Sequence, residues 1–145
     1  MGRAMPTMSY EQMLRTLGGY FRHAGTKQAV ITVSATGADV ADVGGAYRQH
    51  WDIAALQAEA RQQRGLRGLL RETFQDPRQV SQALRLVGAD LDEAGGGPYT
   101  ATMLANCITV HGPDGYERIY WWPAVEQRTI ARMTLRHDPD RRETA

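Results

Sequence analysis

The stretch Gln12–Gly25, QMLRTLGGYFRHAG, returns 70 residues later as Gln82–Gly95, QALRLVGADLDEAG. When the comparison is extended without gaps, residues 12–57 overlie residues 82–127, and 14 of these 46 pairs are identical. A composition rich in Ala, Gly and Arg gives a chance identity of about 8%, or about four pairs. The excess predicts an internal duplication, with two related halves of about 70 residues.

Each half contains an amphipathic helix near its start. In the first half, Ser9 is a favourable N-cap and Gly25 a typical C-terminal stop. In the second half, Asp76 and Pro77 are typical of the residues that begin a helix. The apolar residues between these signals recur at helical spacing, namely Met13, Leu14, Leu17 and Phe21 in the first helix and Val80, Leu84, Val87 and Leu91 in the second. A further helix is predicted over residues 53–64, ended by Gly65.

The strands are predicted from β-branched and aromatic residues. We expect strands at residues 28–35 and 46–51, separated by a turn or bulged hairpin at residues 36–45. In the second half we expect one long strand at residues 99–111, a turn at residues 112–115 and an aromatic strand at residues 116–122. Residues 123–137 follow as a helix by analogy with residues 53–64, although Ala131, Met133 and Leu135 alternate as in a strand.

These elements predict an α+β fold with two pseudo-symmetric α-β-β-α repeats. Their hairpins join into one antiparallel sheet of about four strands, and the helices pack on it because an amphipathic helix needs an apolar partner. We expect a flexible leader at residues 1–8, a single domain at residues 9–137 and a charged tail at residues 138–145. Within the domain, repeat 1 covers residues 9–65, a linker helix covers residues 66–76 and repeat 2 covers residues 77–137.

Composition excludes several classes of protein. The chain has 145 residues, of which 42% are hydrophobic, as in ordinary globular proteins. The net charge of +1 excludes nucleic-acid binding through bulk charge, though not through a local patch. The sequence has no apolar run long enough for a membrane span, no apolar signal-peptide region at its start, and one cysteine, Cys107. We therefore expect a cytoplasmic protein with no membrane association.

No motif indicates a cofactor, a metal or a catalytic centre. The glycine-rich residues 37–45 lack the Gly-Lys-Ser/Thr sequence of a phosphate loop, and the four histidines have no metal-binding spacing. Cys107 and His111 share a predicted strand, where a separation of four residues places them roughly 13 Å apart. At this separation the two side chains cannot form a direct hydrogen bond, so a small enzyme that uses Cys107 is only the third interpretation. We expect no cofactor, no metal and no catalytic residue.

A cluster of arginines provides the second interpretation. Four of them follow at intervals of three or four residues, namely Arg61, Arg64, Arg67 and Arg71. On a continuous helix they would form one stripe and contact the phosphates of a nucleic acid. The plainer interpretation is a solvated face with Glu59 and Glu72 as local partners.

The aromatic strand provides the first interpretation. Trp121 overlies Trp51 in the repeat, so both are expected in the core, while Tyr120 and Trp122 point the other way beside Arg118. Arg48 overlies Arg118. Exposed aromatic and arginine side chains are typical of protein interfaces. We expect a non-catalytic binding module that holds a protein or a small ligand on the sheet face or between the repeats. Its predicted binding residues are Arg48, Arg118, Tyr120 and Trp122, and its expected partner is a protein, which includes a second copy of the chain.

Overall fold

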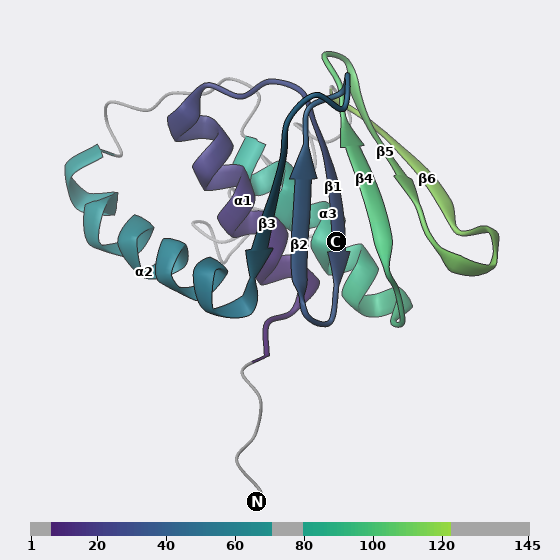
Figure 1. The fold of residues 1–145 in the computed structure, drawn as a ribbon, viewed down its shortest axis with the longest axis horizontal. Coiled ribbons are helices and arrows are strands. Elements are labelled where there is room, and N and C mark those ends of the chain that lie inside the picture. Colours follow the sequence, from purple (N-terminus) through teal and green to yellow (C-terminus); the bar gives the residue numbers. More distant parts are fainter. Residues whose placement is uncertain (1–6, 71–79, 123–145) are drawn as a thin grey trace, which may run out of the picture.

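The computed structural model describes residues 7–70 and 80–122, and in these ranges the fold is α+β, as predicted. The elements are α1 (Tyr10–Ala24), β1 (Ala29–Ser34), β2 (Gly37–Ala41), β3 (Arg48–Asp52), α2 (Ile53–Leu70), α3 (Val80–Ala94), β4 (Tyr99–Met103), β5 (Cys107–His111) and β6 (Glu117–Trp121). One layer is the sheet, and α1 and α3 lie behind it, whereas α2 extends beyond β3 (Figure 1). No helix in the described ranges has the length and apolar character needed to cross a membrane.

Within residues 7–70 and 80–122 the sheet has six antiparallel strands in the order β3-β2-β1-β4-β5-β6, which is already more than the predicted number of about four (Figure 1). Residues 37–41, predicted as part of a turn, form β2, and the predicted long strand is divided into β4 and β5 at a tight turn. In that turn the N–H of Leu104 donates to the carbonyl of Cys107. Gly, Ala and Asp in β2 have low β-propensity, but pairing with β1 and β3 outweighs that preference.

The two central strands, β1 and β4, join the predicted halves. Ile31 lies opposite Ala101, which is the residue 70 positions later in the chain. Beside this pair, Thr32 lies opposite Thr100, and their hydroxyl oxygens are 3.2 Å apart. The bounds of β5 are those of β2 increased by 70, and α3 ends at Ala94, 70 residues after the end of α1 at Ala24.

Helices α1 and α3 pack closely because glycine lies at both contact points. A Cβ atom built on Gly18 of α1 would lie 2.6 Å from the Cα of Ser81 in α3. A Cβ atom on Gly88 of α3 would lie 2.5 Å from the carbonyl oxygen of Tyr10 and 2.6 Å from the Cα of Glu11 in α1. Both distances are below van der Waals contact, so only glycine fits at these positions without movement of a backbone.

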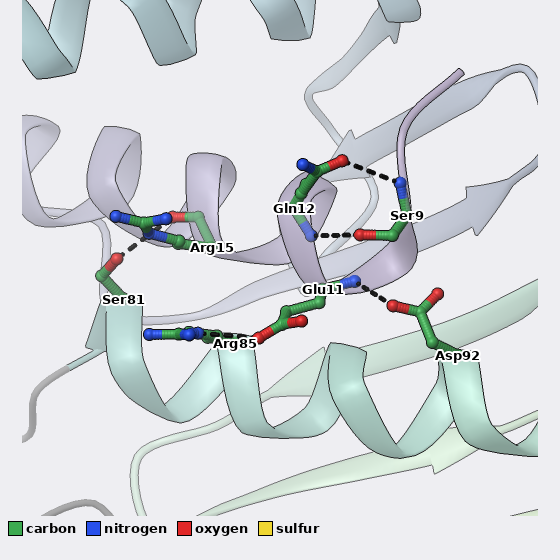
Figure 2. A network of polar contacts seen from close by, with 7 residues as sticks. All are labelled: Ser9, Glu11, Gln12, Arg15, Ser81, Arg85 and Asp92. Atoms are coloured by element: carbon green, nitrogen blue, oxygen red, sulfur yellow. Dashed lines mark hydrogen bonds and ion pairs between the residues drawn. The ribbon is translucent and has the colours of Figure 1, made fainter. Parts of the chain in front are cut away.

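Polar contacts surround this helix pair (Figure 2). Nε of Arg85 on α3 lies 2.8 Å from a carboxylate oxygen of Glu11 on α1. The hydroxyl of Ser81 donates to the carbonyl of Arg15 at 3.1 Å. The predicted caps of α1 are confirmed: Ser9 forms a capping box with Gln12, and Gly25 has the left-handed conformation, with φ of 76°.

The N-terminus of α1 is also capped from α3. The carboxylate of Asp92 accepts hydrogen bonds from the N–H of Tyr10 at 2.8 Å and from the N–H of Glu11 at 3.0 Å. These N–H groups have no partner within their own helix, and a negative charge is favourable at this end of the helix dipole. Burial raises the pKa of the Tyr10 phenol, and Tyr99 and Asp92 raise it further.

Replacing Asp92 by alanine is expected to lower the free energy of unfolding by about 1–2 kcal/mol, because two charge-assisted hydrogen bonds are lost. The neighbouring Glu93 is exposed, and Glu93→Ala is the matched control, with an expected change within about 0.5 kcal/mol. Urea denaturation measures both variants. Equal stabilities of the two variants would contradict the capping role of Asp92.

Helix α2 runs through Gly65 without interruption and is described as far as Leu70. The predicted end of this helix at Gly65 is therefore wrong, because one glycine costs only about 1 kcal/mol in a helix interior. Residues 66–70 of the predicted linker helix are helical and belong to α2. Residues 1–6 of the leader predicted at residues 1–8, and residues 71–76 of the predicted linker helix, lie outside the described residues. The predicted helix start at Asp76 and Pro77, the helix or strand at residues 123–137 and the tail at residues 138–145 also lie outside them.

A candidate binding face on the sheet

The sheet has one face covered by helices and one face that no described helix covers. Alternate residues of each strand point to opposite faces, and directly paired residues share a face. The covered face holds the buried side chains of Ile31, Val40, Ala101 and Val110, which pack in the core with α1 and α3. We call the other side the open face, and it carries Val30, Thr32, Asp39, Arg48, His50, Thr100, Thr102, Cys107, Thr109, His111, Glu117, Ile119 and Trp121.

Tyr120 and Trp122 do not point to the open face, so the prediction of their exposure is wrong. Tyr120 is 8% exposed and Trp122 is 4% exposed. The hydroxyl of Tyr120 donates to a carboxylate oxygen of Asp90 on α3 at 2.7 Å. Nε1 of Trp122 donates to the carbonyl of Leu104 at 2.9 Å. These hydrogen bonds connect Tyr120 to α3 and Trp122 to the turn between β4 and β5.

Trp121, predicted to be a core residue like Trp51, is 54% exposed on the open face. The cause is a difference in register between the two halves. Trp51 lies opposite Ala38, but the residue opposite Ile108, the counterpart of Ala38, is Tyr120. The segment between β5 and β6 spans residues 112–116, one residue fewer than the segment 42–47 between β2 and β3. A shift of one residue turns every side chain of a strand to the opposite face.

Arg48 and Arg118 are not brought together. They lie on β3 and β6, which are the two edges of the sheet, and the same register difference places them on opposite faces. Arg48 is on the open face, opposite Ala41. Arg118 is on the covered side of the sheet, where its guanidinium lies 4.7 Å from the centre of the Tyr116 ring. A joint site of Arg48 and Arg118 therefore does not form within one chain.

Ile119 and Trp121 are the large apolar side chains of the open face that the sequence interpretation missed. Ile119 is 56% exposed and lies opposite Thr109, while Trp121 lies opposite Cys107. They are two residues apart on one strand and therefore adjacent on one face. The signal that could have identified them was the length of the turn before the strand, which the gapless comparison of the halves overlooked.

A row of polar side chains crosses the middle of the open face. Its centre is the pair of Thr32 and Thr100, and each end carries a histidine beside a carboxylate. Nδ1 of His50 lies 2.7 Å from an oxygen of Asp39, and Nδ1 of His111 lies 3.8 Å from an oxygen of Glu117. All four charged or titratable side chains are more than half exposed, so these pairs contribute little to stability. The described residues contain no cluster of three or more acidic, histidine or cysteine residues suited to a metal ion.

The remaining candidates are distributed on α2 and β5. Arg61 and Arg64 are exposed on α2, whereas the side chain of Arg67 and the whole of Arg71 lie outside the described part. Cys107 belongs to the open face but is only 6% exposed, and none of the described hydrogen bonds involves its thiol. The Cys107 thiol is therefore poorly accessible from the described surface.

The open face thus has hydroxyl groups at its centre and two large apolar side chains on one edge strand. No protein-family model, no curated protein and no solved structure matches the chain.

Proposed function

We propose that this chain is a non-catalytic protein-binding module, and that its binding surface is the open face around β6. The observation that carries the proposal is the adjacent exposure of Ile119 and Trp121, each with more than half of its surface in water. Tryptophan is among the residues that contribute most to binding at protein interfaces. Burial of such a pair against a partner removes apolar surface from water, at about 25 cal/mol per Å².

The shape of the face favours a protein partner over a small ligand. Sites for small ligands are concave and enclose most of the ligand. The centre of the open face carries the short side chains of Thr32, Thr100 and Thr102. An extended partner surface can contact the hydroxyl groups of this area while it covers Ile119 and Trp121.

Replacing Trp121 by alanine is expected to weaken binding of protein partners about tenfold or more. Truncation of a tryptophan at a binding hot spot lowers the binding free energy by about 2 kcal/mol or more. The matched control is Tyr47→Ala, because Tyr47 is 55% exposed but lies in the segment between β2 and β3. Immobilised wild-type and variant proteins are used to capture partners from native lysate, and the affinity of each captured protein is then measured. Equal affinities for the wild type and Trp121→Ala would contradict the proposal.

A second candidate function is nucleic-acid binding through α2, favoured by the exposure of Arg61 and Arg64, which form no ion pair with any described residue. If Arg61 and Arg64 contact phosphates, the double variant Arg61→Gln/Arg64→Gln binds DNA more weakly and has a shallower dependence of log affinity on log salt concentration. Absence of DNA binding at low salt would eliminate this candidate.

We further propose that the two halves are pseudo-symmetric repeats that arose by duplication. The proposal is supported by the offset of 70 residues between the C-terminal ends of α1 and α3 and by the pairing of Ile31 with Ala101. The glycine contacts add to it: Gly18 of α1 approaches Ser81 of α3, and Gly88 of α3 approaches Glu11 of α1. Ser81 is the residue 70 positions after Glu11, so the two contacts are reciprocal. Such reciprocal contacts are what a two-fold arrangement produces. Equal destabilisation by alanine at Gly18 and Gly88 is the expected energetic consequence.

A further inference from the structure

The turn between β5 and β6 contains the one aspartate of the chain that is directly followed by glycine, Asp114. In such a pair the backbone nitrogen of the glycine can attack the side-chain carboxyl group of the aspartate within the same molecule, because glycine has no side chain that hinders the approach. The other described aspartates precede residues with side chains, as Asp42 precedes Val43. The sequence thus places the aspartate with the least hindered neighbour in this turn.

The structure leaves both groups of this pair accessible. Asp114 and Gly115 are exposed, and a Cβ atom built on Gly115 would meet no atom within 4 Å. The carboxylate of Asp114 forms no hydrogen bond or ion pair with any residue in the ranges 7–70 and 80–122. No polar contact of this carboxylate therefore has to be broken before the carboxyl group turns toward the nitrogen of Gly115.

The backbone at this position is also strained. The φ angle is 59° at Asp114 and 80° at Gly115, and Asp114 is the one residue other than glycine that has a positive φ in the described part of the chain. The left-handed conformation is unfavourable for a residue that carries a Cβ atom. A product in which the main chain runs through Cβ is no longer subject to this restriction, so the reaction releases the strain at position 114.

We propose that Asp114 converts to isoaspartate in the folded protein, without an enzyme. The nitrogen of Gly115 forms a bond to Cγ of Asp114, and a carboxyl oxygen leaves as water with the amide proton and a proton from the solvent. Water then attacks the main-chain carbonyl carbon of Asp114 in the resulting succinimide ring and breaks its bond to nitrogen. The nitrogen regains a proton, the new carboxylate releases one to the solvent, and nothing is oxidised or reduced.

The conversion lengthens the turn before β6. The main chain of isoaspartate runs through Cβ and Cγ, so the backbone path gains an atom, and the former main-chain carbonyl becomes an exposed carboxylate. The turn sets the alignment of β6 on β5, in which Glu117 lies opposite His111 as the first pair after the turn. We therefore expect isoaspartate at position 114 to weaken the pairing of β6 with β5.

The first test follows the conversion in the full chain. Folded wild-type protein is kept at neutral pH and physiological temperature for several weeks, and electron-transfer fragmentation of its peptides distinguishes isoaspartate from aspartate at equal mass. Asp42 is the control within the same molecule, because it begins the corresponding segment between β2 and β3, and its carboxylate accepts the N–H of Tyr47 at 3.0 Å. We expect isoaspartate to accumulate at position 114, and its absence there or equal amounts at position 42 would overturn the inference.

A synthetic peptide with the sequence of residues 112–116 separates the effect of the sequence from that of the fold. The inference predicts that folded protein and peptide convert at comparable rates, because the carboxylate of Asp114 has no partner that holds it in the described part of the fold. A peptide that converts while the folded protein stays unchanged would show that the turn protects Asp114, and this result would also disprove the inference.

The second test measures the effect on β6. Asp114→Glu is the matched variant, because it keeps the carboxylate while the corresponding ring would be larger and forms more slowly. Urea denaturation followed by circular dichroism compares fresh and aged samples of both proteins. We expect the urea midpoint of the wild type to fall in proportion to its isoaspartate content, and that of Asp114→Glu to stay constant. An unchanged midpoint in wild-type protein that contains isoaspartate would disprove the effect on β6.

Discussion

Replacing Trp122 by alanine is expected to lower the free energy of unfolding by about 3–5 kcal/mol, whereas the same change at the adjacent Trp121 is expected to cost under about 1 kcal/mol. Trp122 is buried, and its Nε1 donates to the carbonyl of Leu104. Its removal leaves a large cavity and an unpaired carbonyl oxygen. Trp121 is more than half exposed, so its truncation removes little packing.

Urea denaturation followed by circular dichroism measures both changes without relying on the fluorescence of the residue that is removed. Trp122→Phe is a useful intermediate variant, because it keeps an aromatic ring in the core but removes the hydrogen bond to Leu104. Its expected cost lies between those of Trp121→Ala and Trp122→Ala. A greater loss of stability at Trp121 than at Trp122 would show that β6 has the opposite orientation, with Trp121 in the core as Trp51 is.

Replacing Gly88 by alanine is expected to destabilise the protein by about 1–3 kcal/mol, although alanine is favoured over glycine in a helix by about 1 kcal/mol. The added methyl group would lie 2.5 Å from the carbonyl oxygen of Tyr10 and 2.6 Å from the Cα of Glu11. Because both atoms belong to the backbone of α1, no side-chain rotation relieves the clash, and α1 must move away from α3.

Gly18→Ala is expected to have a similar cost, since its methyl group would lie 2.6 Å from the Cα of Ser81. The matched control is Gly65→Ala on α2, where an added Cβ meets no atom within 4 Å. That variant is expected to be more stable than the wild type by up to about 1 kcal/mol. Unfolding in urea measures all three variants. If Gly88→Ala were as stable as Gly65→Ala, the close packing of α1 on α3 would be disproved.

The local features of the fold could be predicted from neighbouring residues. Ser9 and Gly25 mark the ends of α1, and the four apolar residues of its predicted face are all buried. These features depend on hydrogen bonds and contacts within a few residues, so their signals are present in the local sequence. The same reasoning failed at Gly65, because the cost of one glycine is smaller than the gain from a continuous helix.

The candidate site could be predicted only in part. The sequence indicated that the aromatic strand at residues 116–122 carries exposed large side chains, but it assigned them to Tyr120 and Trp122. The identities of Arg48 with Arg118 and of Trp51 with Trp121 favoured a gapless match of the two halves. In the structure, however, Trp51 lies opposite Ala38, whereas Tyr120 lies opposite Ile108, the counterpart of Ala38. The turn before β6 is one residue shorter than the turn before β3, and this difference turns the side chains of β6 to the opposite face of the sheet. The residue identities within the strands do not reveal this shift.

The sequence by itself determined the α+β class, the ends of α1 and the recurrence of similar segments 70 residues apart. Only the tertiary structure decided the number of strands, because β2 has weak β-propensity and exists through its hydrogen bonds to β1 and β3. It also decided which of two adjacent tryptophans is buried. That choice depends on how β6 aligns with β5, and the alignment of two strands is set by the turn and by the core that they share.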